Sequence, residues 1–258
     1  MMNLTIWHTA LLPQYDGKIH PRTLENVNKW VALNPELAIT RNIVSDNDAI
    51  EILSNFDKKY NQKATYFFRN EPDGRFKSDL LRLVLLFKFG GMYIDIDQEP
   101  LVPIKDFLDL NDVDFCIGAS SPRMYVCNGI IYAKEKHNMI IKTCLETHLE
   151  RYEQLFSGIR LTGDMSATHT MHSAITKLMG TEKVYPGFVD ILGNRCLFTH
   201  EKGDMSIPES KEHYESYAFY ANNDQTKIMT TRYLGYYEDK LQRNMFVKFK
   251  TEENFNHG

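Results

Sequence analysis

Two neighbouring stretches of sequence decide the fold: Ser78-Asp79-Leu80-Leu81-Arg82 and Lys88-Phe89-Gly90-Gly91-Met92-Tyr93-Ile94-Asp95-Ile96-Asp97. The apolar pattern from Phe76 to Phe89 predicts a helix, and the two glycines stand where a left-handed residue would end it. The apolar run from Met92 to Ile94 predicts a buried strand that leads directly into two aspartates. A helix, a glycine turn and a buried strand in this order are typical of an α/β sheet.

The segments on either side of this unit alternate between strand and helix patterns. We expect strands over residues 4–7, 38–44, 114–119 and 129–133, and helices over residues 23–33, 49–59, 138–152 and 166–179. Residues 65–68 are ambiguous, and after Lys183 the pattern weakens into short β-like segments. Strands that alternate with helices predict an α/β fold with a mostly parallel central sheet. Since no linker or repeat divides the chain, we expect one domain over residues 1–258.

The composition excludes several classes of protein. The 258 residues include 30 Lys and Arg against 34 Asp and Glu, a net charge of −4, and 43% hydrophobic residues. A chain of this kind has neither a disordered composition nor the positive charge of a nucleic-acid binder, so we expect no nucleic-acid partner. The four cysteines, at positions 116, 127, 144 and 196, form no C-x-x-C pair, which argues against a zinc ribbon and favours reduced thiols.

Neither the N-terminus nor the apolar runs indicate a membrane protein. The first residues lack the basic segment of a signal peptide. The longest apolar run, from Leu80 to Phe89, is interrupted by Arg82 and Lys88 and is too short to span a bilayer. We therefore expect no integral membrane segment and a soluble, cytoplasmic protein.

The tripeptide D-x-D occurs three times, so only its context is informative. Asp46 and Asp48 precede a predicted helix and are best explained as capping residues. Asp112 and Asp114 fall in a predicted loop and fit a solvated turn. Only the third pair, at positions 95 and 97, follows an apolar strand.

Asp95 and Asp97 have the pattern of a metal site. In an extended chain, residues i and i+2 face the same side, so both carboxylates would converge at the carboxyl end of a strand, where α/β sheets place their ligands. Two close carboxylates repel each other unless a cation or a shared proton is present. Oxygen ligands favour Mg²⁺ or Mn²⁺. On the preceding helix, Asp79 and Arg82 share one face, either as an internal salt bridge or as part of this site.

Three chemistries use such carboxylates. A calcium-binding EF-hand loop that starts at Asp95 would need Gly and Glu where the chain has Pro100 and Asp106, so it is excluded. A Mg²⁺-dependent phosphatase with Asp95 as nucleophile remains open, although Gln98-Glu99 after the pair is unusual for it. The third is a nucleotide-sugar transferase, in which the aspartates hold a divalent cation against a diphosphate.

Taken together, residues 78–97 resemble the signature of D-x-D sugar-region glycosyltransferases, the group that holds fungal α-mannosyltransferases, bacterial capsular glycosyltransferases and the glucosylating toxins. Weaker similarity covers Ile6-Trp7, residues 26–35, Asn128 to Ala133, and Leu161-Thr162-Gly163. The resemblance implies a GT-A, Rossmann-like fold with a donor-binding part over about residues 1–135 and an acceptor-side part over about 136–258.

The resemblance also implies an activity: a Mn²⁺- or Mg²⁺-dependent transfer of a hexose, with retained configuration, from a UDP- or GDP-sugar to a glycan or glycoprotein acceptor. By position, Asp97 would be the principal metal ligand, and Asp95 would contact the metal and the donor hydroxyls. Arg82 would pair with the donor sugar or diphosphate. These three would form the catalytic centre. The small size and the lack of an anchor fit a bacterial or virus-encoded enzyme.

Four further residues would bind the donor if the resemblance holds. Asp79 would hydrogen-bond the sugar, Tyr93 would lie along the donor, Trp7 would stack on the base, and Asn128 would contact the sugar. The residues alone allow other interpretations: a buried strand tryptophan at 7, a core aromatic at 93 and a turn asparagine at 128.

The chain departs from the family pattern in one respect. Family members carry a late histidine that completes the metal site, whereas residues 217–224 contain none. Candidates for that place are Asn222, Asp224, His200, His213 and water, and a sugar-binding protein without catalysis is a further alternative. The pair His169-x-x-His172 has no evident third ligand, which favours a structural or acceptor-side role.

Overall fold

The structure is a computed structural model that describes residues 2–11, 19, 21–121, 124–156, 167–203, 217–221 and 223–231. The strands are β1 (Met2–Thr9), β2 (Leu37–Val44), β3 (Gly91–Ile94), β4 (Gln98–Pro100), β5 (Phe115–Ser120), β6 (Tyr125–Ala133), β7 (Gly187–Ile191), β8 (Asn194–Gly203), β9 (Tyr217–Ala221) and β10 (Thr226–Thr231). The helices are α1 (Pro21–Ala32), α2 (Asp46–Ser54), α3 (Asn61–Asn70), α4 (Gly74–Phe89), α5 (Met139–Phe156) and α6 (Ala167–Met179), with one 3₁₀ turn, η1 (Ile104–Asp106).

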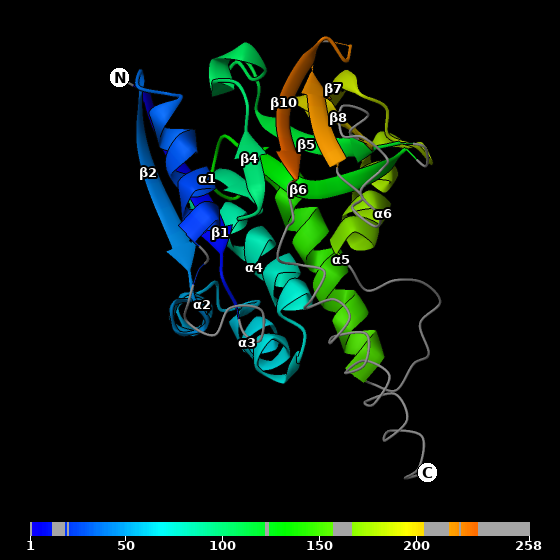
Figure 1. Ribbon diagram of the computed structural model, residues 1–258. Helices are drawn as coiled ribbons and strands as arrows, with labels where there is room; N and C mark the ends of the chain where they lie inside the picture. The colour runs from blue at the N-terminus through cyan, green and yellow to red at the C-terminus, as the bar shows by residue number, and fades with distance from the viewer. Residues whose placement is uncertain are drawn as a thin grey trace.

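The described strands form one sheet in the order β2-β1-β3-β6-β5-β8-β9-β10-β4, with β7 paired to β8 (Figure 1). Three pairings, β1 with β2, β1 with β3 and β5 with β8, are parallel, and the other described pairings are antiparallel. The α/β class is confirmed, and β2-β1-β3 with its crossover helices is the Rossmann-like half expected of a GT-A fold. Antiparallel strands such as β6 enter the sheet where a connection, here residues 121–124 between β5 and β6, is too short for a parallel crossover.

The sheet curls back on itself. β4 follows β3 after only three residues, yet β4 lies at the far end of the sheet, where it pairs with β10. The last strand of the sheet is therefore held close to the end of β3. This closure brings the segment between β3 and β4, residues 95–97, to the inside of the curl.

Two apolar cores cover the two faces of the sheet. One contains side chains of α2 to α6, and the other contains Trp30 of α1 together with residues of η1, β9 and β10. Helix α4 is buried along most of its length, from Ser78 to Phe87, which explains why its sequence is apolar on nearly every side. Figure 1 shows α4 and α5 running side by side below the sheet.

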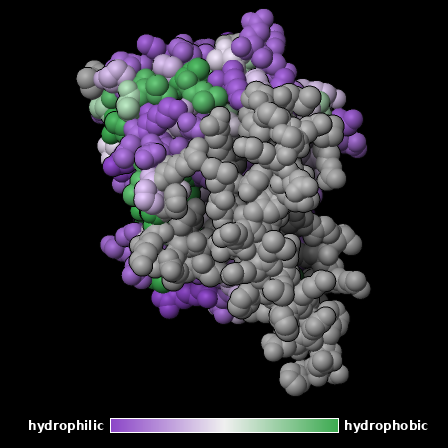
Figure 2. Space-filling model, in the orientation of Figure 1, coloured by the Kyte–Doolittle hydropathy of each residue, from purple (hydrophilic) through white to green (hydrophobic). Residues whose placement is uncertain are grey.

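Most of the elements expected from the sequence are present, with shifted ends. The ambiguous residues 65–68 belong to α3. Ser45 caps α2 in a capping box with Asp48, which confirms the structural interpretation of the first D-x-D. All four cysteines are free thiols. None of the helices in the described residues is long and apolar enough to cross a membrane, and hydrophilic residues make up most of the described surface seen in Figure 2.

A glycine fixes the contact between β1 and β3. Gly91 has a φ of +92°, and a Cβ at this position would lie 2.5 Å from the carbonyl oxygen of Thr5. A side chain here would push β3 away from β1, because the atom that it meets belongs to the backbone. Gly90, with a φ of +70°, ends α4 as the sequence predicts.

We expect Gly91→Ala to lower the free energy of unfolding by about 3 kcal/mol or more, the sum of backbone strain and the clash with Thr5. Gly180→Ala is the matched control, since Gly180 also has a positive φ, +66°, but has nothing within 4 Å of its Cβ position. The control should lose only about 1 kcal/mol. Urea unfolding at pH 7.5 measures both, and equal losses would refute the steric argument.

Candidate active site

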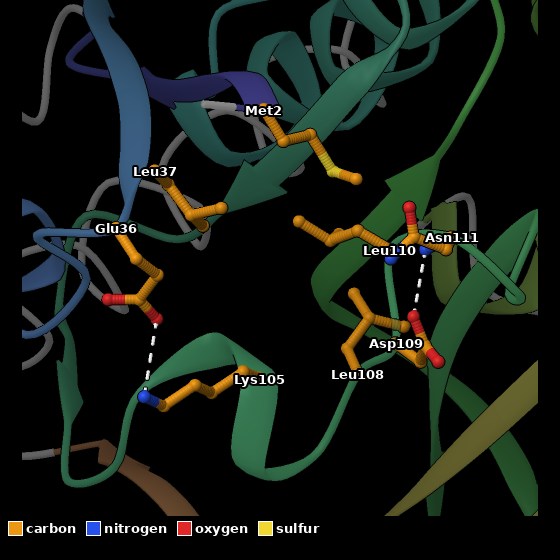
Figure 3. A pocket seen from close by; sticks show the side chains of 8 residues that line it. All are labelled: Met2, Glu36, Leu37, Lys105, Leu108, Asp109, Leu110 and Asn111. Atoms are coloured by element: carbon orange, nitrogen blue, oxygen red, sulfur yellow. Dashed lines mark hydrogen bonds and ion pairs between the residues drawn. The ribbon is translucent and has the colours of Figure 1, made fainter.

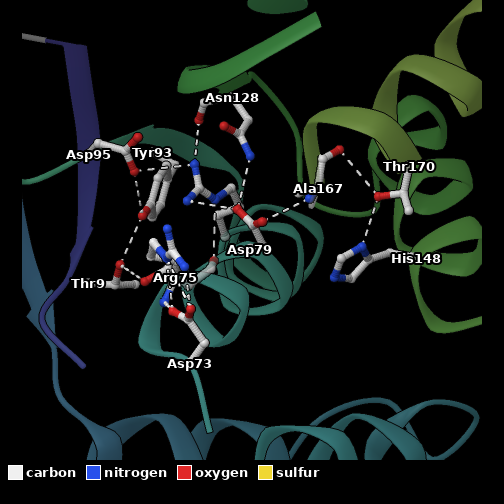
Figure 4. A network of polar contacts seen from close by, with 12 residues as sticks. Thr9, Asp73, Arg75, Asp79, Tyr93, Asp95, Asn128, His148, Ala167 and Thr170 are labelled. Atoms are coloured by element: carbon white, nitrogen blue, oxygen red, sulfur yellow. Dashed lines mark hydrogen bonds and ion pairs between the residues drawn. The ribbon is translucent and has the colours of Figure 1, made fainter. Parts of the chain in front are cut away.

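The candidate site forms where α4 passes beneath the end of β3. Asp79 and Arg82 project from one face of α4 and are almost fully buried, with 6% and 4% of their surface exposed. Asp95 lies directly after β3, and its side chain is 31% exposed. Asn128 belongs to β6, the neighbour of β3 in the sheet. Figure 4 shows Asp79, Asp95 and Asn128, which come from three elements, converging on one place.

Arg82 is the centre of this cluster. Its Nη1 lies 3.2 Å from Asp95 Oδ1 and donates to the carbonyl oxygen of Asn128 at 2.6 Å. Its Nη2 lies 3.1 Å from Asp79 Oδ1, and its Nε donates to the carbonyl oxygen of Ser78. The guanidinium also lies 4.5 Å from the centroid of the Tyr93 ring. The guanidinium of Arg82 therefore donates its hydrogen bonds to groups inside the protein, and one of these contacts fixes the carboxylate of Asp95.

Asp79 is equally engaged. Its Oδ1 accepts from the Asn128 amide at 3.0 Å, and its Oδ2 accepts from the backbone N–H of Ala167, the first residue of α6, at 2.8 Å. The two interpretations that the sequence left open for Asp79 and Arg82 are therefore compatible. The pair is an internal salt bridge, and that bridge forms the floor of the site.

Asp95 and Asp97 do not lie in extended chain. The strand ends at Ile94, and the N–H of Gln98 donates to the carbonyl oxygen of Asp95 at 3.0 Å, which closes a β-turn over residues 95–98. The argument that i and i+2 share one side of a strand is therefore wrong here. The turn forms because β4 must reverse direction to reach β10, and it still leaves both carboxylates half-buried and in electrostatic contact.

A bulge in β6 delivers Asn128. Ile117 of β5 pairs with Ile131, but the next residue, Gly118, pairs with Cys127, so three residues of β6 loop out between them. The loop aims the Asn128 amide at Asp79, and the carbonyl oxygen of Gly129 accepts from the N–H of Asp95. From the residues alone, Asn128 could be a turn asparagine. A bulge inside a strand has no sequence pattern that would distinguish it from such a turn.

Gly129 packs closely beside Asp95. A Cβ at this position would lie 3.4 Å from Asp95 Oδ2 and 3.3 Å from both Gln98 Nε2 and Phe219 Cζ. While Oδ1 of Asp95 is held by Arg82, Oδ2 thus lies beside the backbone of Gly129. A larger residue here would crowd Oδ2.

Three neighbours of the site were missed by the sequence analysis. His8, with 1% of its surface exposed, donates from Nδ1 to the carbonyl oxygen of Ile94, the residue before Asp95, at 2.8 Å. Burial lowers the pKa of His8 to about 4, so the ring is neutral. The hydroxyl of Thr9 contacts the hydroxyls of both Ser78 and Tyr93. No spacing rule joins residues 8, 9 and 78, because the β1–β3 pairing and the packing of α4 against β1 bring them together.

The electrostatics of the site point to a missing positive charge. Burial, and then the charge of Asp95, raise the pKa of Asp97 to about 7. Burial also raises the pKa of Asp95, against the opposing effect of Arg82. Burial alone would lower the pKa of Arg82, but Asp95, Tyr93 and Asp79 raise it overall, so the guanidinium stays charged. Three carboxylates around one guanidinium leave two unbalanced negative charges when all are ionised.

Tyr93 and Trp7 are not exposed in the way that the resemblance implies. Tyr93 is 1% exposed, under the Arg82 guanidinium. Trp7 donates from Nε1 to the carbonyl oxygen of Gly90 and stacks on Phe89 at a centroid distance of 5.1 Å. Gly90 precedes β3 whereas Asp95 follows it, so Trp7 does not join the cluster. Stacking of Trp7 on a base stays a prediction.

The candidates for a late metal ligand do not complete the site among the described residues. Asp224 pairs with His200 at 2.7 Å and with Lys202 at 2.9 Å. No group of three or more His, Cys, Asp or Glu side chains that could hold a metal occurs in the part of the chain that the structure describes. His213 and Asn222 lie outside the described residues, as does the segment 161–163.

The remaining motifs have structural surroundings. His172 stacks on Tyr125 at a centroid distance of 4.0 Å, with His169 tilted against the same ring at 5.3 Å. These contacts account for the spaced histidine pair. In the D-x-D at positions 112 and 114, Asp112 forms an ion pair with Arg195.

A surface pocket of about 320 Å³ lies elsewhere. It is lined by Met2, Leu37, Leu108 and Leu110, with the ion pair between Glu36 and Lys105, 3.7 Å long, beside it (Figure 3). Met2 and Leu37 begin the parallel strands β1 and β2, whereas Asp95 follows the end of β3. This pocket is therefore at the opposite edge of the parallel strands and is not part of the candidate site.

Comparisons with known proteins agree with the resemblance. Residues 21–114 match the family model described as "Glycosyltransferase sugar-binding region containing DXD motif". Lactosylceramide 4-alpha-galactosyltransferase of Mus musculus is 35% identical over 75 residues, which cover 29% of this chain and 19% of that protein. The chain thus matches only about a fifth of the length of this curated relative.

Solved structures that resemble this one include two glycosyltransferases. The PaToxG glycosyltransferase has a TM-score of 0.49 at 15% identity, over 68% of this chain and 69% of that chain. The galactosyltransferase LgtC has a TM-score of 0.35 at 11% identity, over 76% of this chain and 87% of that chain. The matched family region contains Asp79, Arg82, Tyr93, Asp95 and Asp97. The family model therefore matches the part of the chain that contains the D-x-D motif and the buried pair of Asp79 and Arg82.

Proposed function

We propose that this chain is a glycosyltransferase that uses Mn²⁺ or Mg²⁺ to transfer a hexose, with retained configuration, from a UDP- or GDP-sugar to a glycan or glycoprotein acceptor. The observation that carries the proposal is the charge imbalance at Asp95 and Asp97. The two carboxylates are half-buried and in electrostatic contact, and the described residues supply no ion pair to Asp97. A divalent cation is the ligand that would neutralise such a pair.

The residues fit a hard cation. Both side chains offer oxygen ligands only, Asp97 forms no ion pair within the described residues, and Asp95 Oδ2 lies beside the backbone of Gly129. When bound, the ion would neutralise the charge that grows on the diphosphate leaving group. Asp95 and Asp97 would hold it, and water or a group outside the described residues would complete its coordination.

The other residues of the site would act by position. Arg82 fixes Oδ1 of Asp95 and supplies a buried positive charge close to the leaving group. Asp79 orients the side-chain amide of Asn128 by accepting from its nitrogen. The side-chain oxygen Oδ1 of Asn128 would then accept from a hydroxyl of the donor sugar. Since Asp79 is already engaged by Arg82, Asn128 and Ala167, its contact with the sugar would be secondary to this role.

The retained configuration in this proposal comes from the family resemblance, and the carboxylates of the site bear on how it would be achieved. A covalent nucleophile would need an available carboxylate close to the sugar carbon. Asp79 is buried by its partners, and Asp95 and Asp97 are assigned to the cation. We therefore favour attack by the acceptor on the same face as the departing diphosphate, with the phosphate oxygen taking the acceptor proton.

The acceptor side would be formed by the second part of the chain. In this proposal residues 1–135 bind the donor and residues 136–258 bind the acceptor within one domain. The N-terminus of α6 is tied to Asp79 through Ala167. This bond supports the proposal, because it links a helix of the second part of the chain to a residue of the first part.

The first test is turnover. In the presence of Mn²⁺ the purified chain should hydrolyse or transfer from a UDP- or GDP-sugar, and Asp97→Ala should lower the rate about 10²- to 10³-fold, the usual cost of losing one contact to developing charge. Asp112→Ala, from the surface D-x-D, is the matched control and should keep full activity. Release of nucleoside diphosphate measures the rate.

The same assay separates the rival functions. A phosphatase with Asp95 as nucleophile would release phosphate from p-nitrophenyl phosphate with Mg²⁺ and would leave sugar nucleotides intact. A sugar-binding protein without catalysis would bind sugar nucleotides without turnover. Full turnover by Asp97→Ala would contradict the metal site itself.

The raised pKa of Asp97 also predicts that the stability of the protein depends on pH. Its pKa in the folded protein, about 7, is above its ordinary value of 3.8, so the folded state loses stability as the pH rises from 3.8 to 7 and Asp97 ionises. Without divalent cations, Asp97→Asn should therefore raise the free energy of unfolding at pH 8 by about 1 to 2 kcal/mol, a value reduced for the partial exposure of the group.

Thermal unfolding of both proteins at pH 8 and pH 5 checks this sign. The advantage of Asp97→Asn should be about 3 to 6 °C at pH 8. It should be smaller at pH 5, because the carboxyl of Asp97 is then protonated in the folded wild type, which loses less stability. Millimolar Mn²⁺ at pH 8 should reduce or reverse the advantage, because only the wild type gains stability from binding the ion. A wild type more stable than the variant at pH 8 without metal would contradict the charge imbalance.

A further inference from the structure

The end of β1 lies against the D-x-D turn, and its hydroxyl groups form a chain that ends on Asp95. Tyr93 Oη donates to Asp95 Oδ1 at 3.1 Å. Thr9 Oγ1 lies 2.9 Å from Tyr93 Oη and 2.9 Å from Ser78 Oγ. Thr9, Ser78 and Tyr93 are 5%, 7% and 1% exposed, so bulk water does not compete for these groups. Figure 4 shows the links from Thr9 through Tyr93 to Asp95.

The direction of each hydrogen bond follows from the inventory of protons. A hydroxyl carries one proton, and an ionised carboxylate has none to give. Since Tyr93 uses its proton on Asp95, it must accept from Thr9, and Thr9 must in turn accept from Ser78. The chain therefore runs in one direction, from Ser78 to Thr9, Tyr93 and Asp95, and each donated bond strengthens the next.

We infer that Ser78, Thr9 and Tyr93 are positioning residues that, together with Arg82, hold Oδ1 of Asp95 to the protein and so leave Oδ2 for a divalent cation. This inference rests on the proposed metal-dependent function and extends it to residues outside the D-x-D motif. Two donors, the Tyr93 hydroxyl and Arg82 Nη1, converge on Oδ1 from different elements. Oδ2, in contrast, lies beside the backbone of Gly129, where a Cβ would come within 3.4 Å of it.

The inference predicts a graded loss of Mn²⁺ affinity. Tyr93→Phe removes the donor that touches Asp95 and should weaken Mn²⁺ binding about 5- to 30-fold. Thr9→Val keeps the β-branched shape and removes the hydroxyl, and should cost less than Tyr93→Phe. Ser78→Ala, one step further from Asp95, should cost least. Thr9→Ser, which keeps the hydroxyl, should restore most of the affinity lost in Thr9→Val.

Titration of each purified variant with Mn²⁺, followed by the paramagnetic resonance signal of the free ion, measures these affinities without turnover. Thr199→Val is the matched control: Thr199 is a buried strand threonine, 1% exposed, whose hydroxyl donates to the carbonyl oxygen of Ile117 at 3.5 Å. It should bind Mn²⁺ like the wild type. The double variant Thr9→Val/Tyr93→Phe should bind no more weakly than Tyr93→Phe alone, because Thr9 acts only through that hydroxyl.

The outcomes separate this inference from the proposed function. Wild-type affinity in both Tyr93→Phe and Thr9→Val, while Asp97→Asn loses the ion, would overturn the hydroxyl chain and leave the metal site standing. Equal losses in Thr9→Val and Thr199→Val would reduce the effect to general destabilisation and overturn it as well. A wild type that binds no Mn²⁺ would overturn both the inference and the function on which it rests.

Discussion

The arrangement of the site depends on one buried guanidinium. Arg82 lies between Asp79 and Asp95 and also contacts the carbonyl oxygens of Ser78 and Asn128. A charge so deeply buried is tolerated only when it is paired and its hydrogen bonds are satisfied. The helix, the end of β3 and the bulge of β6 must therefore keep their relative positions. A single side chain thus links three elements that are separated by up to 46 residues in the sequence.

The sequence predicts this part of the molecule well because the information is local. The apolar pattern of α4, the two glycines and the run from Met92 to Ile94 each occupy consecutive positions, and the family signature covers the same residues. The position of Asp79 and Arg82 on one face of α4 follows from helical geometry alone. These predictions needed no knowledge of which strand lies beside which.

The sequence fails where the structure depends on contacts between distant segments. The turn at residues 95–98 exists because β4 pairs with β10, more than 120 residues later, so the local pattern suggests an extended chain instead. The bulge at Asn128 and the contact of Thr9 with Tyr93 likewise arise from strand pairing. The antiparallel pairings within the sheet are a further case, since alternation of helices and strands specifies the order of elements and not the direction of each pairing.

The site combines rigidity on one side with unbalanced charge on the other. Oδ1 of Asp95 is held by a charged and a hydroxyl donor, while Asp97 has no ion-pair partner among the described residues. A protein selected for stability alone would replace Asp97 by a neutral residue, because ionising a half-buried carboxylate beside another one costs free energy. Its presence is explained if a cation restores the balance during function. The unfavourable charge is thus a stronger indication of a ligand than the D-x-D tripeptide, which also occurs at a helix cap and in a surface loop of the same chain.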